Sequence, residues 1–349
     1  MDRVSPLGPL NGVRIIDLSR LIPGPFATLC LQGLGATVIK VEDPKGGDYL
    51  RGLPPFVPGP DGPINAWFAA LNRGKYSVAL DLRLAEGKAG LLHLLADADV
   101  LVESFRPGVL ARLGLAPEAL LARFPRLIIA SLTGWGQTGP MSRLPGHDLG
   151  FLALAGLLYR NPTVPTVQWA DLAGGGLCAA LEVTAALYGR DCPGAPPPRS
   201  RHLDIAMLDK LVGLQQTVFA QLAAGASPDE VLTGGDPLYN IYAVADGHVT
   251  VAALEPAFLS AFAAQAPALD ADAIAAWLGE GTRAEWERRL AEACVVPVLS
   301  PAEVAAHPHV VARDLFNGAL PHPPTGPVVG AVPGLGEHTT SELSRAPSR

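Results

Sequence analysis

The sequence predicts an α/β protein that is built on a parallel β-sheet and divided into two domains. Residues 13–18 and 36–41 have the apolar character of short strands, and residues 26–34 between them have that of a helix. A strand, a helix and a second strand within about thirty residues form a βαβ unit, whose two strands are parallel. At 349 residues the chain is too long for one ordinary hydrophobic core, so we expect two domains.

The alternation of strands and helices continues along the chain. Further strands are predicted at 77–82, 100–103 and 127–132, and further helices at 84–96, 107–113 and 116–123. Residues 44–64 contain many glycines and prolines and are predicted to form a surface loop. The loop at 19–25 lacks the GxGxxG spacing, so the dinucleotide-binding fingerprint is absent from it.

Basic residues recur near the predicted strand ends: Arg51, Arg73, Lys75, Arg106 and Arg112. In open α/β sheets, ligands bind outside the carboxyl ends of the strands. Cations gathered at that edge suit a phosphate-bearing ligand. The sequence therefore favours a small anionic ligand at this edge of the sheet.

Charge and composition exclude several classes of function. The formal net charge of −7 argues against broad binding of nucleic acid or membranes. No uninterrupted apolar run reaches transmembrane length and the N-terminus lacks a signal-peptide pattern, so we expect a cytoplasmic protein. The four cysteines are scattered, with no CxxC pair and no His/Cys cluster, so we expect free thiols and no metal site.

Residues 146–188 hold the strongest candidates for chemistry. His147 precedes an apolar stretch at 149–158 that is typical of a helix, and Asp171 precedes three glycines and a second helical stretch at 177–188. Asp171 is therefore predicted at a helix N-terminus, where free N–H groups and the helix dipole stabilise a carboxylate or an oxyanion. Taken alone, capping of the helix is the more ordinary role for this aspartate.

A series of short motifs identifies a family resemblance. They are Leu10–Leu18, Pro23–Pro25, Leu34–Glu42, Gly46–Asp48, Asn72–Lys75, Leu80–Leu82, Ala98–Gly108 and Thr133–Pro140. In this order they resemble the family III CoA-transferases (CaiB/BaiF), which include α-methylacyl-CoA racemases, from about residue 8 to residue 316. The resemblance implies a Rossmann-like large domain with a parallel sheet, a smaller α/β domain, and a homodimer of two chains interlocked as rings.

The resemblance also implies domain bounds. The large CoA-binding domain is expected at 1–200, a connecting helix at 201–224, the small domain at 225–300, and a return segment with a Pro/Gly-rich tail at 301–349. We expect this tail to be partly disordered beyond Asn317.

CoA is the implied ligand, as part of the substrate and not as a separate cofactor. The residues expected to contact it are Arg73, Lys75, Ser104, Phe105, Arg106, Arg112, Leu113 and Asp148. Asp148 has a second interpretation as an acid in the first turn of a helix. One departure lies at Asp43, where some racemases of the family have an arginine.

Three features resemble the racemase branch of the family. They are the Gly146-His147-Asp148 triplet, the D-x-x-G-G-G run that begins at Asp171, and Glu255 before Pro256-Ala257-Phe258. The resemblance implies His147 and Asp171 as the two acid/base groups on opposite faces of the α-carbon. Glu255 is expected to orient His147, reaching in from the partner chain. The backbone amides of residues 174–176 either bind the thioester oxygen or help to place Asp171.

Removing the α-proton of a thioester needs a placed base and stabilisation of the enolate, and inversion needs a donor on the other face. Histidine titrates near neutral pH, and burial can raise the pKa of an aspartate toward neutrality. The favoured activity is thus an acyl-CoA α-epimerase acting on a 2-methyl-branched thioester. Two alternatives are a CoA-transferase that uses Asp171 as nucleophile, and a CoA-binding member of the family without turnover.

Overall fold

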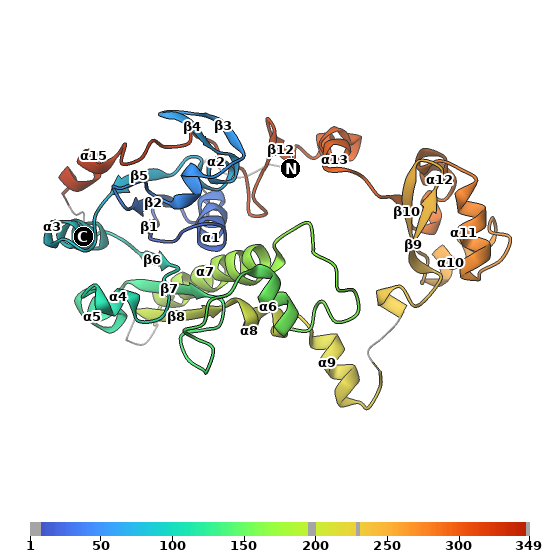
Figure 1. Cartoon of the computed structure of the whole chain (residues 1–349), viewed down its shortest axis with the longest axis horizontal. Helices are drawn as coiled ribbons and strands as arrows, with labels where there is room; N and C mark the ends of the chain where they lie inside the picture. Colours follow the sequence, from blue (N-terminus) through green and yellow to red (C-terminus); the bar gives the residue numbers. More distant parts are fainter. Residues whose placement is uncertain (1–7, 195–199, 228–230, 347–349) are drawn as a thin grey trace. The chain divides into compact units, whose positions relative to one another are not determined.

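The computed structural model describes residues 8–194, 200–227 and 231–346. The chain divides into two compact units, which Figure 1 shows coloured along the sequence. The first unit is Met1–Leu214 with Asn317–Arg349, and the second is Gln215–Phe316. The second unit thus extends beyond the 225–300 expected for a small domain, at both ends.

The first unit is built on a six-stranded parallel sheet. Its strands are β1 (Arg14–Asp17), β2 (Thr37–Glu42), β5 (Tyr76–Ala79), β6 (Val100–Glu103), β7 (Ile128–Thr133) and β8 (Arg201–Ala206). Their order across the sheet is β5-β2-β1-β6-β7-β8, and every pairing is parallel. This confirms the predicted Rossmann-like fold. The order reverses between β1 and β6, where folds of this kind bind ligands.

Helices cover both faces of the sheet. One core contains side chains of α1 (Pro23–Gly33) and α7 (Cys178–Asp191). The other contains side chains of α3 (Ala85–Leu95), α4 (Val109–Arg112) and α5 (Pro117–Arg123). Val100 and Val102 of β6 join the first core and Leu101 joins the second. Because both faces of the sheet are buried there, residues 100–102 of β6 and 128–130 of β7 are uninterrupted apolar runs, which is why these strands are visible in the sequence.

The predicted surface loop at 44–64 is wrong in part. It contains the short helix η1 (Tyr49–Gly52) and a hairpin of β3 (Phe56–Gly59) and β4 (Gly62–Asn65), which leads into α2 (Ala66–Asn72). Six of the eight residues of the hairpin strands are exposed or half-buried. Its strands therefore lack the apolar alternation by which a strand is recognised.

The single connecting helix predicted up to residue 224 is also wrong. Two helices take its place, α8 (Met207–Gly213) and α9 (Gln216–Ala223). The boundary between the two units falls after Leu214, at the break between these helices. The apolar periodicity continues through the break, so the pattern alone does not reveal it.

One continuous helical segment of the described chain, Ala170–Asp191, has the length and apolar composition of a membrane span. Half of its most apolar window is buried inside the protein. Ala179, Ala180 and Val183 of α7 pack in the core against the sheet. The segment is therefore accounted for as a core helix of the first unit.

The second unit has a three-stranded antiparallel sheet in the order β11-β10-β9. The strands are β9 (Tyr239–Val244), β10 (Gly247–Ala252) and β11 (Val295–Pro297). Its longer helices are α10 (Pro256–Ala263), α11 (Ala271–Gly279) and α12 (Arg283–Arg289). The short helices are η3 (Val231–Thr233), η4 (Ala291–Ala293), α13 (Pro301–Ala306) and α14 (Pro308–Ala312). Val249, Phe262, Ile274 and Trp286 are buried in a core of its own.

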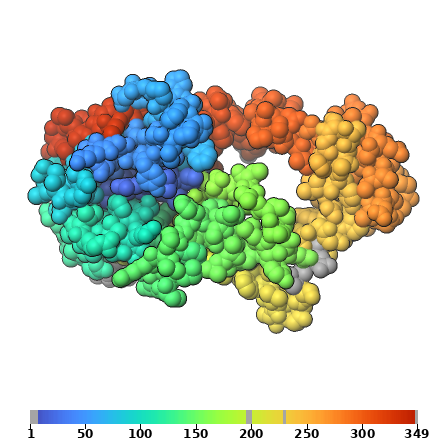
Figure 2. All heavy atoms as spheres, in the orientation of Figure 1, coloured from blue at the N-terminus to red at the C-terminus, as the bar shows by residue number. Residues whose placement is uncertain are grey.

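The described part of the C-terminal segment, up to residue 346, forms secondary structure where partial disorder was expected. It includes β12 (Phe316–Asn317), β13 (Leu320–Pro321) and α15 (Thr339–Ser344). The backbone N–H of His338 donates to the Ser77 carbonyl at 2.9 Å, and Arg14 forms an ion pair with Glu342. In Figure 2 the red C-terminal residues accordingly lie against the blue N-terminal part of the first unit. Specific contacts hold this segment despite its composition.

Candidate functional site

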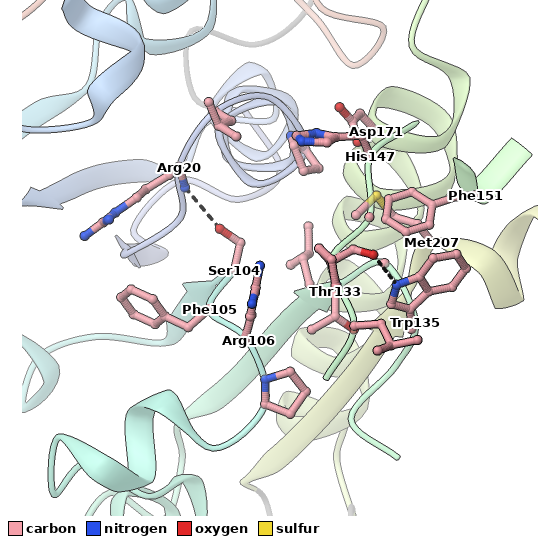
Figure 3. Close-up of a pocket in the computed structure, with 18 of the residues that line it drawn as sticks. Arg20, Ser104, Phe105, Arg106, Thr133, Trp135, His147, Phe151, Asp171 and Met207 are labelled. Carbon is pink, nitrogen blue, oxygen red and sulfur yellow. Dashed lines mark hydrogen bonds between the residues drawn. The ribbon is translucent and has the colours of Figure 1, made fainter. Parts of the chain in front are cut away.

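A pocket with a volume of about 530 Å³ opens at the point where the strand order reverses. Arg20 and Leu21 line it from the loop after β1, and Ser104, Phe105 and Arg106 line it from the loop after β6. Figure 3 shows these side chains around the cavity. The two loops are joined by the backbone N–H of Arg20, which donates to Ser104 Oγ at 3.1 Å. The carboxyl ends of β1 and β6 thus form one wall of the site.

His147 and Asp171 line the same pocket, as the two-base hypothesis requires. His147 is the exposed residue before α6 (Asp148–Leu154), and Asp171 lies in the first turn of the π-helix η2 (Ala170–Leu177). Figure 3 shows both side chains on the same side of the cavity. The fold therefore brings together an imidazole and a carboxyl that are well separated along the sequence.

Asp171 is half-buried, and this changes its acidity. Burial raises its pKa from 3.8 to about 7, and the nearby charge of Asp148 acts in the same direction. A group with this pKa exchanges protons in either direction near neutral pH. Such displaced pKa values cluster at functional sites.

Asp148 supports the helix that holds Asp171. Its Oδ1 accepts the backbone N–H of Asp171 at 2.9 Å. The carboxylate from α6 thus satisfies one of the N–H groups that have no partner within the helix at the start of η2. Burial raises the pKa of Asp148 as well, while backbone hydrogen bonds from Asp171 and Ala170 oppose this. Asp148 does not line the pocket, so its observed contact is with the neighbouring helix and not with the expected CoA site.

The three glycines after Asp171 do not precede the helix, as the sequence suggested, but lie inside η2 and are buried. A Cβ on Gly176 would lie 2.6 Å from Phe26 Cδ1, and a Cβ on Gly175 would lie 3.0 Å from Pro23 Cβ. The glycines therefore let η2 pack closely against α1. Two roles were considered for residues 174–176, binding the thioester oxygen and placing Asp171. The close packing of η2 supports the second role. The sequence-based suggestion that Asp171 itself caps the helix is also wrong, since Trp169 occupies the cap position.

A second pocket of about 340 Å³ adjoins the first. Arg20, Phe105 and Val109 line both pockets. The second pocket is also lined by Leu113 and by Asp43, which forms an ion pair with Arg83 at 3.6 Å. Of the predicted CoA contacts, Ser104, Phe105, Arg106 and Leu113 thus lie at these pockets. Arg112 is exposed on α4 and lines neither of them.

The structure does not place Arg73 and Lys75 at the expected CoA site. Both side chains instead bond to groups inside the protein. The Lys75 ammonium is fully buried, 3.3 Å from Asp17 Oδ2 and 2.8 Å from Thr28 Oγ1. Burial lowers its pKa to about 8, with Asp17 opposing that shift. The Arg73 guanidinium donates to the backbone carbonyls of Ala70 and Pro321. A lysine after a glycine in sequence gives no sign of whether it points outward or inward.

Several pocket residues were not predicted from sequence: Arg20, Leu21, Tyr49, Trp135 and Met207. Arg20 and Met207 follow β1 and β8, and the position after a parallel strand is the signal that could have found them. Trp135 Nε1 donates to the Pro145 carbonyl at 3.3 Å, and the Trp135 ring meets Phe151 edge-on at 4.6 Å between centroids. Such a contact across the pocket wall carries no sequence signal.

Glu255 lies in the second unit, where it is the exposed residue before α10. Its predicted contact with His147 stays a prediction. Among the described residues there is no group of three or more His, Cys, Asp or Glu side chains that could hold a metal ion. The four cysteines are free thiols.

Comparisons with known proteins show the family of this chain. A family model described as CoA-transferase family III matches residues 10–349. The chain belongs to this family. Human α-methylacyl-CoA racemase is 34% identical, over 96% of this chain and 92% of that protein. An acetyl-CoA:oxalate CoA-transferase from Acetobacter aceti is 38% identical, over 65% of this chain and 58% of that protein. A CaiB/BaiF family protein from Brucella suis has a TM-score of 0.84 at 28% identity, over 97% of this chain and 100% of that one.

Asp171→Asn is expected to stabilise this family III protein at pH 8 and to have a smaller effect as the pH falls toward 4. The folded-state pKa of Asp171 is about 7 against an ordinary 3.8. Between these values the folded state binds a proton that the unfolded state lacks, so stability falls as the pH rises. Asparagine removes this penalty, and we expect a gain of roughly 1–3 kcal/mol at pH 8.

Urea unfolding at several pH values measures this effect. Asp209→Asn is the matched control, because Asp209 is an exposed acid in the first turn of α8. An Asp171→Asn variant whose stability relative to wild type is the same at pH 5 and pH 8 would contradict the raised pKa.

Proposed function

We propose that this protein is an acyl-CoA α-carbon epimerase, similar to α-methylacyl-CoA racemase, that works by two-base 1,1-proton transfer. The observation that supports this most directly is that His147 and Asp171 line one pocket. An enzyme that inverts a carbon needs a proton acceptor and a proton donor on opposite faces. A single base would return the proton to the face from which it came.

In the proposed reaction one of the two groups removes the α-proton of a 2-methylacyl thioester. The electron pair of the broken C–H bond forms the second bond of a C=C double bond between the α-carbon and the thioester carbon. The π electrons of the C=O bond move to the oxygen, which takes the negative charge of the enolate. The other group then donates a proton to the opposite face, and the carbonyl is restored. The pKa of about 7 at Asp171 suits a group that accepts the proton in one direction and donates it in the other.

The two adjoining pockets suit the elongated CoA group. Its nucleotide end would lie in the second pocket, where Arg20 supplies positive charge. Arg83 also lines this pocket and forms ion pairs there with Asp43 and Asp81. Pantetheine would then pass Phe105 and Val109, which line both pockets, and bring the thioester to His147 and Asp171. CoA enters here as part of the substrate.

Glu255 would complete the site from a partner chain. It belongs to the second unit, and a homodimer of interlocked chains would supply it in trans. A carboxylate that accepts an N–H of the His147 ring would fix the tautomer and raise the basicity of the other nitrogen. This role depends on the dimer, which is part of the proposal.

The extent of the matches to known relatives supports racemase activity over transferase activity. The match to human α-methylacyl-CoA racemase extends over 96% of this chain, whereas the match to the Acetobacter aceti CoA-transferase extends over 65%. The alternative is a CoA-transferase in which ionised Asp171 attacks the thioester, forms an acyl anhydride and releases CoA thiolate. Transferases of similar identity among the relatives favour it.

Incubation with a 2-methylacyl-CoA of one configuration in heavy water tests the proposal. Deuterium uptake at the α-carbon and loss of configuration, without an acceptor acid, are expected. Transfer of CoA to an added carboxylic acid, with an acyl-Asp171 that hydroxylamine traps, would instead establish the transferase. Binding of CoA with neither outcome would show a family member without turnover.

A further inference from the structure

Leu21 has an unusual backbone conformation at the wall of the pocket. Its φ is +63°, in the left-handed region that a leucine avoids because its Cβ crowds the following carbonyl. Leu21 lines the pocket beside Arg20, in the loop that follows β1. Such a conformation persists only where surrounding contacts impose it, and functional sites are where it is commonly found.

The contacts that impose it come from a buried ion pair beneath the loop. Asp48 Oδ2 accepts the backbone N–H of Leu21 at 3.0 Å and lies 3.3 Å from Lys40 Nζ. The same ammonium donates to the carbonyl of Ser19 at 2.9 Å. Neither charged side chain has any exposed surface. The loop is therefore held on both sides of Arg20, by an acceptor at Leu21 and by a donor at Ser19.

The same carboxylate also reaches a second part of the pocket wall. Asp48 Oδ1 accepts the backbone N–H of Leu50 at 3.1 Å and so caps η1, which begins with the pocket residue Tyr49. Arg20, between the two held positions, donates its N–H to Ser104 across the strand reversal. One buried pair thus sets the position of Leu21 and Tyr49 and supports the join to the β6 loop.

A purely stabilising role explains this arrangement poorly. Burying two charges costs much of what their attraction returns, so a buried pair is weak evidence for stability. Here the pair forms hydrogen bonds with two backbone groups of one loop. In that loop Leu21 adopts a conformation that a leucine disfavours.

We propose that Lys40 and Asp48 are positioning residues, which hold the loop of residues 19–22 with Leu21 left-handed and so shape the pocket for the CoA thioester. This rests on the proposed function for the identity of the ligand. Loss of the pair would let the loop relax, and the relaxed loop would have to be reordered whenever the ligand binds. Affinity then falls while the chemical step, which depends on His147 and Asp171, changes less.

The test is a double-mutant cycle between Asp48 and Leu21, measured as CoA affinity by calorimetry. Leu21→Ala and Leu21→Gly both remove the side chain, but only glycine adopts the left-handed conformation freely. With Asp48 present the two variants should bind CoA within about two-fold of each other. In the Asp48→Ala background, the Leu21→Gly protein should bind about 5–30-fold more tightly than the Leu21→Ala protein. The KM for the acyl-CoA should follow this pattern, with kcat changing less.

Equal affinity of the glycine and alanine variants in the Asp48→Ala background would overturn the proposal. If Asp48→Ala does not fold, Asp48→Asn replaces it. Its neutral amide oxygen accepts the Leu21 N–H less strongly than the carboxylate does, so the same preference for glycine is expected at a smaller size. Thermal unfolding of the same variants supplies a readout that needs no ligand. Leu21→Gly should be more stable than Leu21→Ala with Asp48 present, and this difference should shrink without it.

Failure of the proposed function can be told apart from failure of this inference. A wild-type protein that neither binds CoA nor exchanges the α-proton would reject the function, while the unfolding cycle still decides whether Asp48 holds Leu21. A wild-type protein that does both, with no coupling between residues 48 and 21, would reject the positioning role alone.

Discussion

Asp171→Asn and His147→Gln should each lower the rate of α-carbon inversion by roughly 10²–10⁴-fold. Both substitutions keep the approximate shape of the side chain and remove its ability to exchange a proton near neutral pH. Inversion uses both groups in every turnover, so loss of either is enough. The measurement is the loss of optical rotation or of chiral purity from one enantiomer of a 2-methylacyl-CoA.

The two variants should differ from each other in a way that identifies the two-base mechanism. Each retains the group on one face, which can still exchange the proton on that face without inversion. Slow deuterium uptake should therefore persist with one enantiomer in Asp171→Asn and with the other enantiomer in His147→Gln. Asp209→Asn, at an exposed acid of α8, is the control. Inversion at the wild-type rate in either folded variant would contradict the assignment.

Asp17→Asn should destabilise the protein by about 3–5 kcal/mol, although Asp17 does not line the pocket. The Asp17 carboxylate has no exposed surface and lies 3.3 Å from Lys75 Nζ, with Thr28 Oγ1 at 2.7 Å. Burial alone would raise its pKa, but Lys40, Lys75 and two hydroxyl donors lower it to about 2. Removing the negative charge leaves the buried Lys75 ammonium without its carboxylate partner, which is why the expected loss is large.

Urea unfolding at pH 7 measures this loss, and the pH dependence supplies a second check. Because the folded pKa of Asp17 is about 2 and the ordinary value is 3.8, its contribution is present above about pH 4 and is lost as the pH falls toward 2. Asp81→Asn is the matched control, since Asp81 forms a 2.7 Å ion pair with the exposed Arg83. Pairs of that kind contribute little. Equal effects of the two substitutions would contradict the importance of burial.

The fold was predicted correctly for strands whose two faces are both buried in the sheet. The strand at Val100–Glu103 was predicted with its observed bounds, because Val100, Leu101 and Val102 are covered on both faces of the sheet and form an uninterrupted apolar run. The hairpin at Phe56–Asn65 was missed, because most of its residues are exposed or half-buried and its glycines and prolines are equally typical of a loop. Pattern-based prediction detects buried surface, and this hairpin buries little.

For the candidate site, residue type was informative and side-chain direction was not. Lys75 and Arg106 are both basic residues near strand ends, yet Lys75 is buried against Asp17 and Arg106 lines the pocket. Similarly, Asp148 and Asp171 both stand in the first turn of a helix, and only Asp171 lines the pocket. Which way each side chain points depends on neighbours that are remote in sequence.

Local pattern and motifs in order were enough to predict the family, the parallel α/β sheet, and the histidine and aspartate at which chemistry is expected. The folded chain was needed to see that His147 and Asp171 line one pocket, that burial raises the pKa of Asp171 to about 7, and that Asp48 accepts the N–H of a left-handed Leu21. Proximity and desolvation arise between segments that are remote in sequence, so no local pattern reports them.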